Sequence, residues 1–170
     1  MAEEFNNPKL DKIFQIGILV KNLDEVKKNY EEVLGIGPWS EPGIMSGKKM
    51  PLSINGVPFE DDFFKVTMLH RYGFEIELIE PIGDTPLKQW VDKHGNGLHH
   101  VDFRLNGVEY EEFLKKVAEM KGEDTWLRGT GFGGRMDFSY LDLTEELGMY
   151  VEVKPDRPNH DGTPRPGYEY

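Results

Sequence analysis

The chain has 170 residues, 38% of them hydrophobic and 12% aromatic, which is enough to pack one domain or two small modules with a shared core. Its 20 basic and 31 acidic residues give a formal net charge of −11 with no offsetting basic run, so we expect no nucleic-acid or membrane partner. The absence of cysteine excludes disulfides, thiolate ligands and a cysteine nucleophile, and without a signal-peptide pattern or an apolar run of membrane-spanning length we expect a cytoplasmic protein.

The first half of the chain predicts a strand, a helix and further strands. Residues 13–20 are rich in β-branched and apolar side chains, which is typical of a strand. An N-cap at Asn22 then begins a helix whose apolar residues recur at helical spacing: Val26, Tyr30, Val33 and Leu34. Prolines and glycines break residues 39–62 into short pieces, and the runs 63–69 and 74–79 predict a hairpin.

The second half predicts the same order of elements after a short linker helix, which Thr85 caps. A strand over 98–105 precedes a helix near 108–121, whose buried stripe we expect to consist of Phe113, Val117 and Met120. The glycine-rich run 129–135 is expected to be a loop, either an ordinary hairpin loop or a mobile cover over a site. The final hairpin is formed by residues 136–141 and 149–154.

The repeated order predicts an α+β fold of two tandem βαβββ modules. Within a single domain over residues 1–170, we assign the first module to 12–81, the linker helix to 82–97, the second module to 98–155 and an irregular tail to 156–170. Successive side chains of a strand face opposite sides, so each sheet should have an apolar face under its helix and a polar, concave face.

Four polar residues hold matching positions in the two modules. Gln15 and His100 lie in the first strands, and Glu77 and Glu152 lie in the last strands. Taken singly, each is explained by the solvated face of its strand, but the matching positions favour one shared centre. Because neighbouring strand residues alternate, we expect only one of His99 and His100 to enter that centre. The other histidines are expected in surface or turn positions: His70, His94, His99 and His160.

From about residue 13 to 155 the chain resembles the vicinal oxygen chelate superfamily, which contains glyoxalase I and methylmalonyl-CoA epimerase. The resemblance is carried by residues 89–101, by Glu77-Leu78-Ile79-Glu80-Pro81 and by Gly129-Thr130-Gly131. It implies two modules whose curled, mostly antiparallel sheet surrounds a central divalent metal ion. It also implies the metal ligands, which are Gln15, Glu77, His100 and Glu152. The epimerase pattern has a histidine where this chain has Gln15, whereas the whole set is similar to zinc-using glyoxalase I.

The implied ligand set favours carbon-acid chemistry. One imidazole, two carboxylates and one amide oxygen suit an octahedral Zn, Co, Ni, Mn or Mg ion with two positions open to substrate. Such an ion acts as a Lewis acid and stabilises the enolate formed when a carbon next to a carbonyl loses its proton. We expect Glu152 to be the catalytic base. Epimerases of this group use a second glutamate, and no acid stands at the matching positions 65–67.

Three arginines are candidates for holding an anionic group of the substrate, although surface solvation also explains each of them: Arg104, Arg128 and Arg135. The leading hypothesis is a homodimeric, divalent-metal-dependent isomerase, epimerase or lyase that acts on a small molecule, either methylmalonyl-CoA epimerase-like or glyoxalase I-like. Ring-cleaving dioxygenases of the same fold need a site with two histidines and one carboxylate, and only one histidine is available here. The alternative is a non-catalytic small-molecule-binding protein of the bleomycin-resistance type. The sequence leaves open whether the modules pair within a chain or across a dimer.

Overall fold

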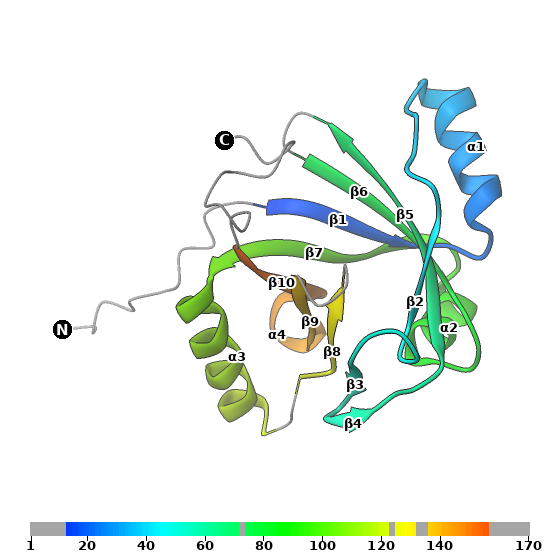
Figure 1. Ribbon diagram of the computed structural model, residues 1–170. Helices are drawn as coiled ribbons and strands as arrows, with labels where there is room; N and C mark the ends of the chain where they lie inside the picture. Colours follow the sequence, from blue (N-terminus) through cyan, green and yellow to red (C-terminus); the bar gives the residue numbers. More distant parts are fainter. Residues whose placement is uncertain (1–12, 72–73, 123–124, 132–135, 157–170) are drawn as a thin grey trace.

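The computed structural model of the chain describes residues 13–71, 74–122, 125–131 and 136–156 (Figure 1). Ten strands form one curled, open sheet in the order β2-β5-β6-β1-β7-β10-β9-β8-β3-β4. Only the pairs β1–β6 and β7–β10 are parallel, and the other strand pairs are antiparallel. The predicted α+β fold with a curled, mostly antiparallel sheet is therefore confirmed.

The two halves of the chain contribute similar series of elements. The first half contains β1 (Ile13–Leu19), α1 (Leu23–Leu34), β2 (Gly43–Ser46), β3 (Leu52–Ile54), β4 (Val57–Pro58), β5 (Asp62–Arg71) and β6 (Phe74–Pro81). The second half contains α2 (Pro86–His94), β7 (Gly97–Asn106), α3 (Gly107–Lys121), β8 (Leu127–Gly131), β9 (Met136–Leu143), α4 (Thr144–Leu147) and β10 (Met149–Asp156). Antiparallel pairing of β1 with β7 joins the halves within one chain.

Local sequence signals set the helix ends as expected. The side chain of Asn22 accepts a hydrogen bond from the backbone N–H of Glu25, and the side chain of Thr85 accepts one from Lys88. Helix α1 ends at Gly35, whose φ of 64° is the left-handed conformation that glycine adopts without steric cost. No helix in the described part of the chain is long and apolar enough to cross a membrane.

The apolar strand faces lie under α1 and α3, which flank the outside of the curled sheet in Figure 1. Leu78 packs in a cluster with Leu23 of α1, and Val151 and Val153 pack in another with Leu114 of α3. The polar residues that alternate with them in β6, β7 and β10 consequently face the concave side. This arrangement puts the predicted site residues of those three strands on one surface.

The helical stripes are shorter than predicted. Val33, Leu34 and Met120 are 77%, 61% and 59% exposed, because each lies in the last turn of its helix and the packed clusters use earlier turns. The buried stripe of α3 is instead formed by Tyr110, Leu114 and Val117, with Phe113 partly buried beside it. The predicted stripe was therefore right for Val117 and wrong for Met120.

A hairpin that the sequence analysis missed lies inside residues 39–62. Strands β3 and β4 turn at Asn55 and Gly56, whose φ values of 48° and 76° suit the two-residue turn that Asn-Gly favours. Although the hairpin belongs to the first half of the chain, β3 pairs with β8 of the second half. The insertion thus lengthens the sheet at the edge far from β2.

The glycine-rich segment is partly strand. Gly129 and Gly131 belong to β8, so the prediction of a loop was wrong for this part, and residues 132–135 lie outside the described residues. A Cβ atom at Gly129 would lie 2.5 Å from both Leu52 Cδ2 and Phe138 Cζ, because the side chains of Leu52 in the inserted hairpin and Phe138 in β9 pack directly against the backbone of β8. Close packing rather than loop conformation explains the glycine at this position.

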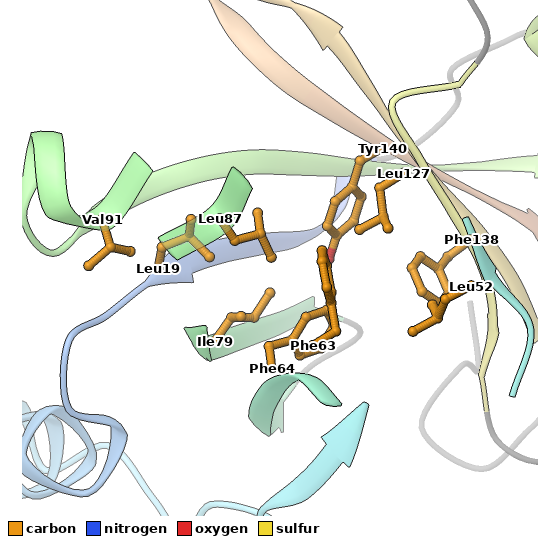
Figure 2. Close-up of a cluster of buried hydrophobic side chains, with 10 residues drawn as sticks. All are labelled: Leu19, Leu52, Phe63, Phe64, Ile79, Leu87, Val91, Leu127, Phe138 and Tyr140. Atoms are coloured by element: carbon orange, nitrogen blue, oxygen red, sulfur yellow. The ribbon is translucent and has the colours of Figure 1, made fainter. Parts of the chain in front are cut away.

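An apolar core fills part of the concave side. Figure 2 shows ten of its side chains, which come from both halves of the sheet, from α2 and from the inserted hairpin: Leu19, Leu52, Phe63, Phe64, Ile79, Leu87, Val91, Leu127, Phe138 and Tyr140. Tyr140 is fully buried, and its ring centroid lies 4.5 Å from that of His100. The core therefore reaches the polar residues of the concave face and keeps water away from them.

Candidate metal centre

Three of the four predicted ligands meet on the concave face. Glu77 of β6, His100 of β7 and Glu152 of β10 offer ligand atoms that all lie within 4.8 Å of one another. His100 Nε2 is 3.4 Å from Glu77 Oε2 and 3.4 Å from Glu152 Oε2. Donors bonded to one ion at about 2.0–2.2 Å lie about 3–4 Å apart, so the spacing fits a single divalent ion.

A glycine makes room for this cluster. Gly17 pairs with Glu77 on one side and with His100 on the other, because β1 lies between β6 and β7. A Cβ atom at position 17 would lie only 1.8 Å from His100 Cε1. The imidazole thus crosses over the backbone of β1 toward the carboxylate of Glu77. Gly17 was not among the predicted site residues.

The cluster is buried and short of hydrogen bonds. Glu77, His100 and Glu152 are 4%, 0% and 2% exposed. Among the described residues, Glu77 Oε2 and His100 Nε2 have no aligned hydrogen-bond partner, although they face each other. A neutral imidazole and two carboxylates are strong ligands for a divalent cation. These buried donor atoms therefore fit a metal ion such as Zn, Co, Ni, Mn or Mg.

Charge neutralisation in the metal-free cluster depends on His100. Burial alone lowers the pKa of His100, but the nearby carboxylates of Glu152 and Glu77 outweigh it and raise the pKa from 6.5 to about 9. The pKa of Glu152 is lowered, because Lys154 and His100 together outweigh the effect of burial. A protonated imidazole thus takes the role of the cation between the two carboxylates.

His99 lies beside His100, which corrects two expectations. The β1–β7 register shifts so that His100 faces Gly17 while Leu98 faces Ile18, and His99 is the extra residue of a β-bulge. The bulge turns both rings to the same side, with 3.1 Å between His99 Nδ1 and His100 Nδ1. His99 is also buried at 3% exposure and is not a surface or turn residue. Strand alternation failed here because it assumes a regular ladder.

His99 is held as a neutral ring in an aromatic setting. It stacks on Tyr150 with a centroid distance of 4.3 Å and contacts the edge of Trp90. Burial, with help from the neighbouring charges of His100 and His94, lowers the pKa of His99 to about 2. A neutral His99 Nδ1 is able to accept the Nδ1 proton of His100, which leaves His100 Nε2 free to bind a metal.

Gln15, the fourth predicted ligand, lies next to the cluster but bonds to a lysine. Lys154 of β10 reaches across β7 and donates to Gln15 Oε1 at 2.5 Å. The same ammonium donates to Glu152 Oε2 at 2.8 Å and to Asp102 Oδ2 at 3.2 Å. Asp102 and Lys154 were not predicted as site residues, although their strand positions put them on the same face as Glu152.

The three predicted substrate-binding arginines have different positions. Arg104 lies on the concave face, with Nε 3.3 Å from Asp102 Oδ2 and the guanidinium 4.2 Å above the ring of Phe14. Arg128 is 44% exposed and pairs with Glu111 of α3 at 3.0 Å, on the outer side of the sheet. Arg135 lies outside the described residues. Of the two arginines that the structure describes, Arg104 lies near the cluster and Arg128 does not.

Comparison with known proteins identifies the family. The family model described as the glyoxalase/bleomycin resistance protein/dioxygenase superfamily matches residues 14–139. The chain is 26% identical over 147 residues to the uncharacterized protein YqjC of Bacillus subtilis (strain 168), covering 85% of this chain and 91% of the relative.

Solved structures share the fold at low sequence identity. A hypothetical protein of Bacillus halodurans C-125, BH1468, matches with a TM-score of 0.58 and 21% identity over 87% of this chain and 96% of its own. Methylmalonyl-CoA epimerase of Mycobacterium tuberculosis matches with a TM-score of 0.60 and 15% identity, covering 88% and 90%. A methylmalonyl-CoA epimerase in complex with methylmalonyl-CoA and NH4+ matches with a TM-score of 0.57 and 17% identity, covering 85% and 94%. At these identities the likeness concerns the fold alone.

Proposed function

The chain belongs to the glyoxalase/bleomycin resistance protein/dioxygenase superfamily, and from this premise we propose that it is a divalent-metal-dependent isomerase, epimerase or lyase. Its reaction removes a proton from a carbon next to a carbonyl group of a small molecule. The observation that carries the proposal is the buried cluster of Glu77, His100 and Glu152, whose ligand atoms lie within 4.8 Å of one another. An all-protein cluster of this kind is costly to bury unless a cation completes it.

The residues of the cluster have separate roles in this proposal. Glu77, His100 and Glu152 hold the ion, and His99 fixes the imidazole of His100 through the Nδ1 contact. A bound divalent ion supplies Lewis-acid stabilisation of the negative charge that develops on a carbonyl oxygen. Glu152 accepts the proton of the neighbouring carbon, since its lowered pKa keeps it ionised at neutral pH.

The apolar lining of the site favours proton transfer from carbon. Tyr140 and the rest of the core in Figure 2 exclude water next to the cluster. Electrostatic stabilisation of a developing oxyanion is stronger where water is excluded. The buried Tyr140 hydroxyl has a pKa well above 10, because of burial and the nearby charges of Glu152 and Glu77, so it stays protonated.

The fold neighbours support the epimerase branch of the proposal but do not select a substrate. Several of those neighbours are methylmalonyl-CoA epimerases. A CoA group is anionic and would need cationic partners, but two lysines of the first half already form ion pairs, Lys48 with Asp61 at 3.2 Å and Lys65 with Asp24 at 3.0 Å. We therefore propose the substrate class as carbonyl carbon acids, with CoA thioesters as one member.

Metal content tests the proposal directly. We expect the purified protein to bind one divalent ion per chain, and Glu77→Gln or His100→Ala to lose it. Glu75→Gln is the matched control, because Glu75 is a buried glutamate two residues earlier on the same face of β6. Proton exchange with solvent deuterium then tests the chemistry on methylmalonyl-CoA, the methylglyoxal–glutathione hemithioacetal and simple keto-sugars. Absence of both metal binding and exchange would contradict the proposal and favour a non-catalytic binding protein.

A further inference from the structure

The side-chain amide of Gln15 is fully buried, but only its oxygen atom has a hydrogen-bond partner. Its carbonyl oxygen accepts a hydrogen bond from Lys154 Nζ at 2.5 Å, and within the described residues its Nε2 has no hydrogen-bond partner. A lysine ammonium has three donors and no acceptor, so the carbonyl oxygen rather than the NH2 group must face it. The orientation of this amide is therefore set by chemistry, and the NH2 group is left as an unused donor.

Lys154 uses all of its hydrogen-bond donors. Its three N–H bonds match three acceptors: Gln15 on β1, Asp102 on the neighbouring β7 and Glu152 on β10 itself. The side chain is only 7% exposed, so water is not a ready substitute for any of these acceptors. For Gln15 to turn its carbonyl toward a metal, it would have to leave one ammonium donor unbonded and place its NH2 group against a positive charge.

Gln15 is nonetheless close to the metal cluster. Lys154 Nζ bonds both Gln15 Oε1 and Glu152 Oε2, and Glu152 Oε2 lies 3.4 Å from His100 Nε2. The amide thus lies on the same concave face, one side chain away from the atoms that would hold the ion. A buried donor without a partner at this place is suited to a ligand oxygen.

We propose that Lys154 keeps Gln15 out of the metal's ligand set, so that Glu77, His100 and Glu152 alone hold the ion and the Gln15 NH2 group donates to an oxygen of the substrate. This inference rests on the proposed function and refines it. Three protein ligands leave an octahedral ion with three open positions instead of two. The substrate class is then a compound with two neighbouring oxygens, one of which carries negative charge that the Gln15 amide contacts.

Cobalt substitution tests the ligand count without relying on activity. We expect Gln15→Ala to bind Co²⁺ one to one, with an unchanged visible absorption spectrum and a loss of affinity below about tenfold, whereas Glu77→Ala loses more than about 100-fold. Gln89→Ala is the matched control, because Gln89 is an exposed glutamine on α2. A changed spectrum or a Glu77-like loss in Gln15→Ala makes Gln15 a ligand and overturns the inference. A wild-type protein that binds no divalent ion overturns the proposed function instead.

A variant of Lys154 tests whether this lysine is what keeps Gln15 out of the ligand set. In Lys154→Met the Gln15 carbonyl is released, so we expect a changed Co²⁺ spectrum that reverts in the double variant Lys154→Met with Gln15→Ala. Lys154→Leu, which also lacks a donor, replaces the methionine variant if that protein does not fold. An unchanged spectrum in a folded Lys154 variant shows that the lysine does not keep Gln15 away from the metal. That result overturns the role proposed for Lys154.

Oxalate is a suitable probe of the proposed donor, because it is a planar dianion with neighbouring oxygens. We expect Gln15→Ala to weaken oxalate binding to the Co²⁺-loaded protein by about 10- to 100-fold, which is typical of one lost hydrogen bond to a charged acceptor. Gln89→Ala should bind oxalate like the wild type. Equal oxalate affinity in Gln15→Ala and wild type contradicts the donor role.

Discussion

Two buried clusters lie side by side on the concave face and neutralise their charge in different ways. In the first, Glu77 and Glu152 face His100, and within the described residues Glu77 Oε2 accepts no aligned hydrogen bond and His100 Nε2 forms none. In the second, Lys154 gives each of its three donors to an acceptor, among them Asp102 and Gln15. Glu152 belongs to both clusters. The lysine cluster carries its cation in the covalent chain, whereas the histidine cluster depends on a proton or a metal ion.

The two clusters therefore differ in role. The lysine cluster fixes side-chain orientations, whereas the histidine cluster can exchange its cation and take part in chemistry. A covalently tied ammonium does not leave, so the lysine cluster gives Gln15 and Glu152 fixed orientations. A proton or an ion does exchange, so the histidine cluster responds to pH and to metal concentration. Nearly identical burial in the two clusters shows that burial alone does not distinguish these roles; the state of the hydrogen bonds does.

Removal of the internal cation should have the largest effect. Lys154→Met leaves Asp102 and Glu152 as buried carboxylates without the ammonium, and we expect the free energy of unfolding to fall by about 3–5 kcal/mol. Urea denaturation of the metal-free protein measures this change. Lys65→Met is the matched control, because Lys65 pairs with the exposed Asp24 and should cost less than about 1 kcal/mol. Equal losses in both variants would contradict a special role for Lys154.

The stability of the metal-free protein should depend on pH, because the histidine cluster relies on a proton on His100. The pKa of His100 is raised from 6.5 to about 9 in the folded state. Its stabilising contribution is therefore complete below pH 6.5 and is lost as the pH rises through 9, by up to about 3 kcal/mol. Urea titrations between pH 6 and 10 on the wild type and on His100→Gln measure the difference. An equally steep decline in His100→Gln would show that another group causes it.

The glycine beneath the imidazole should link packing to metal binding. In Gly17→Ala the new Cβ would lie 1.8 Å from His100 Cε1, so the ring must move. We expect a loss of about 1–3 kcal/mol in stability together with weaker metal binding, measured by denaturation and by metal titration. Gly43→Ala is the control, because nothing lies within 4 Å of its added Cβ. Full metal affinity in Gly17→Ala would mean that His100 is not held in place by this contact.

The sequence predicted the faces of the strands better than their contacts across the sheet. Alternation and the internal repeat placed Glu77, His100 and Glu152 on one surface, because a regular strand has a strict period of two. The bulge at His99 depends on pairing with β1, which no local pattern encodes. The bonds of Lys154 depend on a side chain that crosses a neighbouring strand, and in sequence it resembles any solvated lysine. The Asn55-Gly56 turn was a readable hairpin signal, but its pairing with β8 was not.

The contact between the two histidines should have the smallest effect, and it tests how the metal cluster is oriented. His99→Phe keeps an aromatic ring next to Tyr150 but removes the Nδ1 atom that lies 3.1 Å from His100 Nδ1. Without that acceptor the His100 ring loses the partner of its second nitrogen, and we expect metal affinity to fall by about 10- to 100-fold. Calorimetric metal titration measures the change, with His94→Phe as the control, because His94 is exposed at the end of α2.

Since the His99 pKa of about 2 keeps this ring neutral, the effect should be the same at pH 6 and pH 8 once the protonation of His100 is corrected for. An effect that grows at low pH would instead mean that His99 itself takes up a proton, and that the buried aromatic setting does not hold it neutral.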